Sequence, residues 1–277
     1  MDSNQLNEWL RLILRWAHVF AGIMWVGTTY FFTWLDGRFG ELAEKSASAP
    51  DGEAPERHVW MVHSGGFYKA EKQKVPSVMP TKLHWFRWEA AITWLTGVLL
   101  MIMVYYQGGL MVSLEDSRIS NGAAIWLSVG LILASWPVYN VLWFKVAKND
   151  AVGVILSGLL VVALSWFVSR YMTGRAAYLQ VGAMFGTIMA FNVWMRILPA
   201  QRRMVAALAE GREPNQTEVL RAKTSSKHNT FLAVPVVFIM LSNHFPSITY
   251  GRHYEWVILS VLIFVGWGAA KLIRRAG

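Results

Sequence analysis

Two histidines lie in apolar surroundings, where an imidazole ring is chemically significant. His18 falls inside the apolar run 9–35, and His244 ends a later run in the sequence LSNHFP. An ionisable ring in hydrocarbon is costly unless it is paired or ligated. At about 1.5 Å per residue, His18 is expected roughly 6 Å and His244 roughly 10 Å from the midpoints of their runs, towards the same membrane face. The two imidazoles are therefore expected at similar depth.

Two facing histidines in a helix bundle are a ligand pair for a b-type haem. We therefore predict that His18 and His244 ligate haem iron, with Met240 as a possible substitute for His244. A histidine that only hydrogen-bonds to a neighbouring helix is the simpler alternative for either residue.

A second set of polar side chains is expected together at the opposite membrane face. Its members fall at the start of the second apolar run and late in the third and fifth: His84, Trp85, Arg87, Trp88, Glu89, Asn140, Asn192 and Arg196. Asp36, Trp136, Trp143 and Trp194 are expected at the same level. Buried polar groups must be satisfied by each other or by a ligand. Aromatic walls, amides and an arginine fit a flat, anionic heterocycle. A purely structural polar cluster is the alternative.

Seven apolar runs must position these residues: 9–35, 84–106, 123–144, 152–170, 176–196, 230–245 and 254–273. Most approach the ~20 residues that a helix needs to cross the hydrocarbon of a bilayer. The sixth run is short and contains Pro235, which predicts a kink. With 55% hydrophobic residues, 15 Trp and 13 Met, the sequence predicts an all-α, polytopic transmembrane helix bundle of about seven spans.

The residues behind the net charge of +9 are distributed unevenly between the segments on the two sides of the membrane. Most of the 26 Lys and Arg residues fall in segments on one side, which predicts an outside N-terminus and an inside C-terminus. The basic character is thus explained by topology, and no nucleic-acid partner is expected. The bilayer is the expected environment.

The whole chain, 1–277, is expected to be one integral membrane domain with two long cytoplasmic segments. In the first, 36–83, the stretch 46–56 (SASAPDGEAPE) is expected to be mobile, and Gly65 and Gly66 permit a tight turn. The second, 197–228, is predicted to be an amphipathic helical hairpin. Gly182 and Gly186 are spaced to let two helices approach closely.

Several kinds of site are excluded by residue type or spacing. The chain has no cysteine, which excludes disulfides, thiolate zinc sites, cysteine-ligated iron-sulfur clusters and covalent c-type haem. It contains no HExxH motif, phosphate-binding loop or GxSxG turn in a suitable context. His58 and His63 are poorly spaced for a metal on a helix, and His228 and His253 are interpreted as residues at the edges of spans.

Four separate motifs carry a family resemblance. They are HVFAGIMWVGTTYFFTWLD, GGFYKAEK, LHWFRWEAAITWLTG and LSNHFP, and they resemble the membrane domain of bacterial membrane-bound, cytochrome-c-linked urate oxidases. The resemblance covers nearly the whole chain. It implies location in the bacterial cytoplasmic membrane, oxidation of urate or a related purine, with 5-hydroxyisourate as the product from urate, and transfer of electrons to a cytochrome c.

The sequence departs from this family at its C-terminal end. Members typically continue through one further span into a cytochrome c with a CxxCH motif, whereas this sequence ends at Gly277 without a cysteine. A separate cytochrome c is the expected partner. The alternatives are a different electron acceptor, or a chain that is an isolated domain. The pattern of His18, Trp25 and Gly27 also resembles short haem-associated membrane proteins of the protoporphyrinogen-oxidase and copper-resistance types.

The resemblance, taken with the inner polar residues, leads to a mechanistic hypothesis. Arg87 or Arg196 would bind the negative charge of urate, and Trp85 or Trp88 would stack on its rings. The amides of Asn140 and Asn192 would bind its lactam edges.

Glu89 or His84 is the expected catalytic base, and haem b between His18 and His244 would relay electrons. Two alternatives remain: a transporter for a purine or another small anion, and a haem-bearing membrane subunit that transfers electrons without a substrate site.

Overall fold

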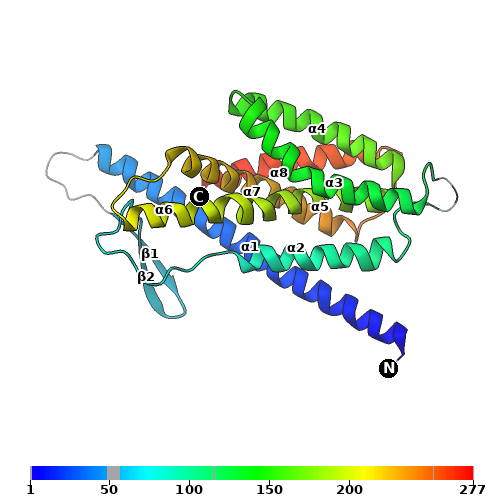
Figure 1. Cartoon of the computed structure of the whole chain (residues 1–277), viewed down its shortest axis with the longest axis horizontal. Coiled ribbons are helices and arrows are strands. Elements are labelled where there is room, and N and C mark those ends of the chain that lie inside the picture. The colour runs from blue at the N-terminus through cyan, green and yellow to red at the C-terminus, as the bar shows by residue number, and fades with distance from the viewer. Residues whose placement is uncertain (1, 49–56, 114, 116, 252, 277) are drawn as a thin grey trace.

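The computed structural model describes residues 2–48, 57–113, 115, 117–251 and 253–276. They form a bundle of long helices with a small β-hairpin at one end (Figure 1). The α-helices are α1 (Ser3–Ser48), α2 (Trp88–Leu100), α3 (Asn121–Val141), α4 (Asp150–Tyr171), α5 (Gly174–Phe191), α6 (Leu198–Ala209), α7 (Gln216–Ser242) and α8 (Glu255–Ala276). Three continue through π-helical segments, η1 (Met101–Tyr106), η2 (Leu142–Val146) and η3 (Asn192–Ile197). The predicted helical bundle is confirmed.

Six helical segments in the described residues are long and apolar enough to cross a membrane. They are 3–48, 88–106, 121–146, 150–171, 174–209 and 255–275. The expected sixth run lies in α7, which is not among these six segments. The first half of its 27 residues is polar, and its apolar part is therefore short. Figure 1 shows α7 running along the bundle beside the others and the two termini at opposite ends. The orientation in the membrane stays a prediction.

Two helix boundaries differ from the expected ones. α1 continues past Leu35 to Ser48, because the following residues are mostly good helix formers and Arg38 pairs with Glu41 at 3.0 Å. α2 begins at Trp88 and not at His84. The stretch expected to be mobile is helical as far as Ser48, and its remainder, 49–56, lies outside the described residues.

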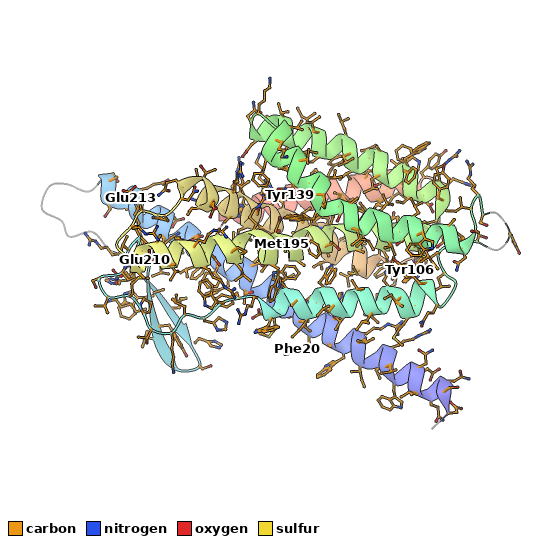
Figure 2. The ribbon with its side chains drawn as sticks, viewed as in Figure 1. Phe20, Tyr106, Tyr139, Met195, Glu210 and Glu213 are labelled. Carbon is orange, nitrogen blue, oxygen red and sulfur yellow. The ribbon has the colours of Figure 1, made fainter. Side chains whose placement is uncertain are left out.

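The core of the bundle lies around α5. Eleven of its 18 residues are buried, and it packs against α3 and α7. A Cβ atom at Gly182 would lie 2.9 Å from Cγ2 of Ile239 on α7, whereas one at Gly186 would meet nothing within 4 Å. Close approach through small residues is therefore confirmed at Gly182 alone. Around the core, Figure 2 shows side chains projecting from the outside of the bundle, and many of them are large and apolar, as a lipid-facing surface requires.

Polar residues fix the starts of four helices. The side chains of Ser120, Asn149, Thr173 and Asn215 each accept a hydrogen bond from a backbone N–H in the first turn of α3, α4, α5 and α7, respectively. These caps satisfy donors that have no partner within the helix. They set where each helix begins and therefore which residues reach the same level of the bundle.

The described parts of the two long segments, 36–83 and 197–228, contain regular structure. In the first, β1 (His58–His63) and β2 (Gly66–Glu71) form an antiparallel hairpin. It turns at Ser64 and Gly65, whose φ angles are +49° and +75°, as the expected tight turn requires. In the second, α6 and the start of α7 form the predicted helical hairpin, which an ion pair of 2.7 Å between Arg203 and Glu218 joins.

Candidate functional site

A chain of buried amides joins three helices where α5 passes into η3. Asn192 is completely buried and accepts a hydrogen bond of 3.2 Å from the indole N–H of Trp136 on α3. Its own amide donates to the side-chain oxygen of Asn229 on α7 at 3.0 Å. Asn229 donates in turn to the carbonyl oxygen of Met189 at 3.0 Å. The predicted convergence of Asn192 with the third helix is therefore present.

Arg196 lies one turn after Asn192 and faces the same helices. Its Nη2 donates to Oδ1 of Asn140, and its guanidinium carbon lies 3.9 Å from the ring centroid of Phe144 and 5.9 Å from that of Trp136. Nη1 is buried without a hydrogen-bond partner in the described structure. A buried donor of this kind costs free energy unless something accepts its hydrogen bond. We call Trp136, Asn140, Phe144, Asn192 and Arg196 the arginine cluster.

The π-helical form of η3 has a local cause. Pro199 is the second residue of α6, lacks an N–H and crowds the carbonyl group four residues earlier. The turn before it is wider, and the N–H of Leu198 bonds to the carbonyl of Val193. Such widened turns occur often at functional sites.

A histidine and a tyrosine form a second buried pair beside the arginine cluster. Nδ1 of His228 lies 2.8 Å from the hydroxyl of Tyr139, and its ring centroid lies 4.0 Å from that of Trp143. His228 lies outside the six candidate spans, and burial, with a smaller effect from Lys227, lowers the pKa of its imidazole to about 4. The ring is therefore neutral at neutral pH. The Tyr139 ring lies 6.2 Å from Phe144, which places the pair next to the arginine cluster.

The residues expected at the start of the second span form a separate, more exposed group. His84 is exposed and lies edge-on to Phe86, with 4.5 Å between ring centroids. Trp88 is also exposed and meets Trp194 of η3 edge-on at 5.9 Å. Arg87 lies over Trp88 at 5.4 Å.

Two further residues of this group are partly buried. Trp85 is partly buried and packs against the small apolar cluster of Ala90, Val193 and Leu198. Glu89 is partly buried in the first turn of α2. The structure thus divides the predicted pocket in two, with η3 between the parts.

The comparison with known families bears on the whole of this arrangement. The family described as urate oxidase N-terminal matches residues 4–275. The chain belongs to the urate oxidase N-terminal family. Neither a curated protein nor a solved structure matches it. Membership supports a urate-related function for this membrane helix bundle.

In this urate oxidase N-terminal chain, the two histidines predicted to hold haem lie apart in depth. Nδ1 of His18 lies 2.8 Å from the carbonyl oxygen of Thr93, and its ring packs against Gly97 on α2. His244 is exposed, and the residue before it, Asn243, accepts a hydrogen bond of 3.5 Å from Tyr105. Gly97 and Tyr105 are eight residues apart, which is roughly 12 Å along a helix.

The expectation of equal depth ignored the tilt of α1, which crosses α2 obliquely in Figure 1. His18 retains Nε2 for a ligand, but no hydrogen bond or ring contact joins it to His244 in the described structure. Nor do the described residues hold a group of three or more His, Asp or Glu side chains that could bind a metal ion. Haem ligation by His18 and His244 stays a prediction, and the proposals below do not depend on it.

Sequence reasoning missed His228, Tyr139 and Asn229. His228 precedes the apolar part of α7, so the sequence places it at the edge of a span, and Asn229 has no assigned role. The helix begins at Gln216 and carries both residues inside the bundle. Tyr139 was overlooked as the neighbour of Asn140. The available signal was the spacing of Ser225, His228 and Asn229 by three and four residues, which places them on one helical face.

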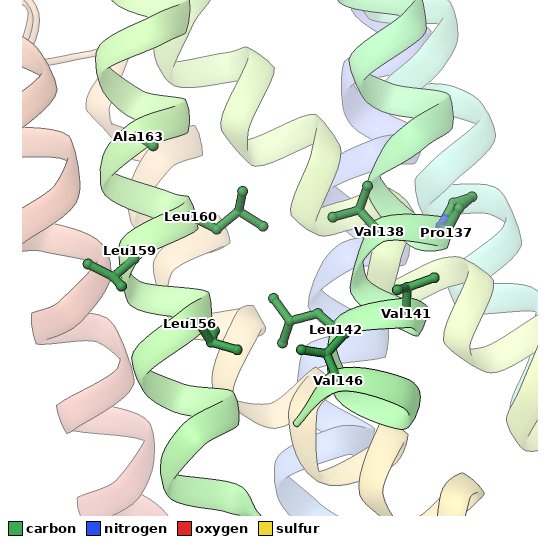
Figure 3. Close-up of a pocket in the computed structure, with 9 residues that line it drawn as sticks. All are labelled: Pro137, Val138, Val141, Leu142, Val146, Leu156, Leu159, Leu160 and Ala163. Carbon is green, nitrogen blue, oxygen red and sulfur yellow. The ribbon is translucent and has the colours of Figure 1, made fainter. Parts of the chain in front are cut away.

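Two surface grooves of the described structure are lined by residues outside these clusters. One, of about 650 Å³, lies between α3 and α4 and has an almost wholly aliphatic lining, as Figure 3 shows. Pro137 and Val141 line it and are sequence neighbours of Trp136 and Asn140. The other groove lies in the α6–α7 hairpin.

Proposed function

We propose that this chain is a membrane oxidoreductase that oxidises urate to 5-hydroxyisourate at the arginine cluster and passes the electrons to a cytochrome c. Membership of the urate oxidase N-terminal family supports the substrate. The observation that carries the choice of site is the Arg196 guanidinium, enclosed by aromatic rings and with a buried, unused N–H donor.

Urate is a planar monoanion at neutral pH, and the arginine cluster supplies what such a molecule needs. Nη1 of Arg196 offers a charged hydrogen bond, which is stronger than a neutral one. Phe144 and Trp136 offer ring faces and edges for stacking. Asn140 already accepts from Arg196, so the anion would share the guanidinium with this amide. Asn192, which Trp136 and Asn229 hold in place, would bind a lactam edge.

The reaction takes urate and one water to 5-hydroxyisourate, with the release of two electrons and two protons. His228 is our candidate for the group that accepts a proton, through the hydroxyl of Tyr139. Its imidazole is neutral before substrate binds. The negative charge of urate favours the protonated ring, so binding raises the pKa of His228 towards neutrality. Each of two cytochrome c molecules would accept one electron.

Glu89 and His84, the bases expected from the sequence, occupy the more exposed group near Trp194. In this proposal they, with Arg87 and Trp88, line the approach to η3 from the membrane surface. Arg87 would attract the anion, and no proton transfer is assigned to Glu89 or His84.

The test is urate oxidation by the protein in lipid nanodiscs. Wild type is expected to consume urate and to reduce two molecules of added cytochrome c per urate. Arg196→Gln is expected to lower the apparent affinity for urate about 100-fold, because a charged hydrogen bond and a buried charge are lost. Arg203→Gln is the matched control, since Arg203 is an exposed arginine on α6 whose partner is Glu218.

Equal urate turnover by wild type and Arg196→Gln would exclude the arginine cluster as the site. Urate uptake into liposomes without oxidation would instead favour the transporter alternative. An absorption band of haem that urate does not change, with no urate consumed, would favour the electron-transfer subunit.

A further inference from the structure

The two faces of the β1–β2 hairpin differ in environment. On one face lie Val59 and Ala70, which are directly opposite each other. Val59 is only 7% exposed, and β1 packs against α1. The ion pair between Lys72 and Asp36, 2.5 Å long, fixes the end of β2 to α1. This face therefore attaches the hairpin to the bundle.

The other face is open and carries three large apolar side chains together with Lys69 and the His58–Glu71 pair. Trp60, Val62 and Phe67 alternate with the attached residues along the strands, and they are 58%, 71% and 81% exposed. Val62 and Phe67 are cross-strand partners and form one continuous patch with Trp60. Exposing such a patch to water is costly, and patches of this kind usually mark a surface that contacts a membrane or another molecule. We call these three residues the hairpin patch.

The position of the hairpin indicates that the hairpin patch contacts the membrane surface. Its base is paired with Asp36, the first residue after the apolar run of α1, and the chain after β2 leads directly into the span that starts at Trp88. Figure 1 shows the hairpin extending sideways from the end of the bundle, across the direction of the helices. A ribbon that lies across the spans at their ends runs along the plane of the bilayer.

The charges around the patch match an anionic surface. Lys69 lies over the ring of Trp60 at 5.6 Å, and Lys74 and Lys82 follow on exposed positions before α2. The only acidic side chain between residues 57 and 83 is Glu71, which pairs with His58 at 3.7 Å. Aromatic rings beside lysines are typical of the interfacial layer, where rings enter the headgroup region and cations meet anionic lipids.

We propose that the β1–β2 hairpin is an interfacial anchor that lays Trp60, Val62 and Phe67 into the headgroup layer of an anionic bilayer beside the bundle. The anchor orients the end of the protein that carries the start of α2, and it is independent of what the arginine cluster binds. The lysines add affinity for anionic lipid.

The absence of cysteine from the sequence permits a direct test. Phe67→Cys is labelled with an environment-sensitive fluorophore and placed in nanodiscs of phosphatidylcholine with or without phosphatidylglycerol. A blue-shifted emission that lipids with a headgroup-level nitroxide quench is expected, and the quenching is expected to be stronger with phosphatidylglycerol. Tyr68→Cys is the matched control, since it lies on the same strand and points to the opposite face. Its label is expected to be quenched less.

Water-like emission from the Phe67→Cys label, with quenching no greater than at Tyr68, would overturn the proposal. So would emission that shifts only when two protein copies share one nanodisc, because the patch would then be a contact between copies. A second variant, Val62→Cys, keeps the native Phe67 and carries the label on the other strand of the patch, which excludes an effect of replacing Phe67. The same quenching is expected there, and its absence counts equally against the anchor.

Discussion

The arginine cluster and the start of α2 hold residues of the same types in opposite environments. Asn192 is completely buried and hydrogen-bonded to Trp136 and Asn229, whereas His84 and Trp88 are exposed. Both groups lie at one end of the bundle, and η3 contacts both. The difference teaches that the level of a residue in a bundle does not decide its role. What decides it is whether the residue lies on the side of its helix that faces the other helices.

The largest expected effect separates two histidines. His228→Gln is expected to lower kcat for urate about 100-fold, as is typical for the loss of a general base, because no imidazole remains beside Tyr139. His84→Gln is expected to leave kcat unchanged. Steady-state kinetics over a range of pH would check this. An unchanged kcat for His228→Gln, with a loss for His84→Gln, would restore the base expected from the sequence.

A smaller effect is expected from two arginines. Arg196→Lys keeps the charge but loses the planar, forked donor and its stacking on Phe144, so KM for urate is expected to rise ~10-fold. Arg87→Lys is expected to change KM by less than ~2-fold, because Arg87 is partly exposed and solvent screens its charge. Similar KM values for the two variants would mean that both groups bind urate directly.

The smallest effect concerns stability. Asn192→Ala is expected to lower the free energy of unfolding by about 1–3 kcal/mol, because Trp136 and Asn229 lose their partner in a buried place. Glu89→Gln is expected to change it by less than ~0.5 kcal/mol. Thermal unfolding in nanodiscs measures both. An unchanged free energy of unfolding in Asn192→Ala would show that the amide chain does not stabilise the packing of the helices.

Much of the bundle could be predicted from the sequence because hydropathy and helix length are local properties. The apolar runs gave six of the spans, and the turn at Gly65 and the helical hairpin of 197–228 were also expected. The extension of α1 to Ser48 was not, because its polar last turns leave no hydropathy signal. The seventh helix was expected to be short because the polar residues before Thr230 conceal a continuous helix.

The site was harder to predict, since it depends on rotation and tilt. The joining of Asn140, Asn192 and Arg196 follows from residues on matching faces of neighbouring helices, and it was correctly expected. The depth of His18 relative to His244 could not be obtained, because counting residues along a helix measures depth only when the helix is upright. His228 enters the site through a contact with Tyr139 that no local pattern encodes.

The widened turn of η3 has a consequence for how this protein tolerates insertions and deletions. A helix rotates by about 100° for each residue, so Arg196 and Asn192 face the same neighbours only while the residues between them keep their number. Removing one residue from this turn would swing the guanidinium out of its enclosure, although every side chain of the cluster would still be encoded. Length variation here is therefore expected to be more damaging than most single substitutions.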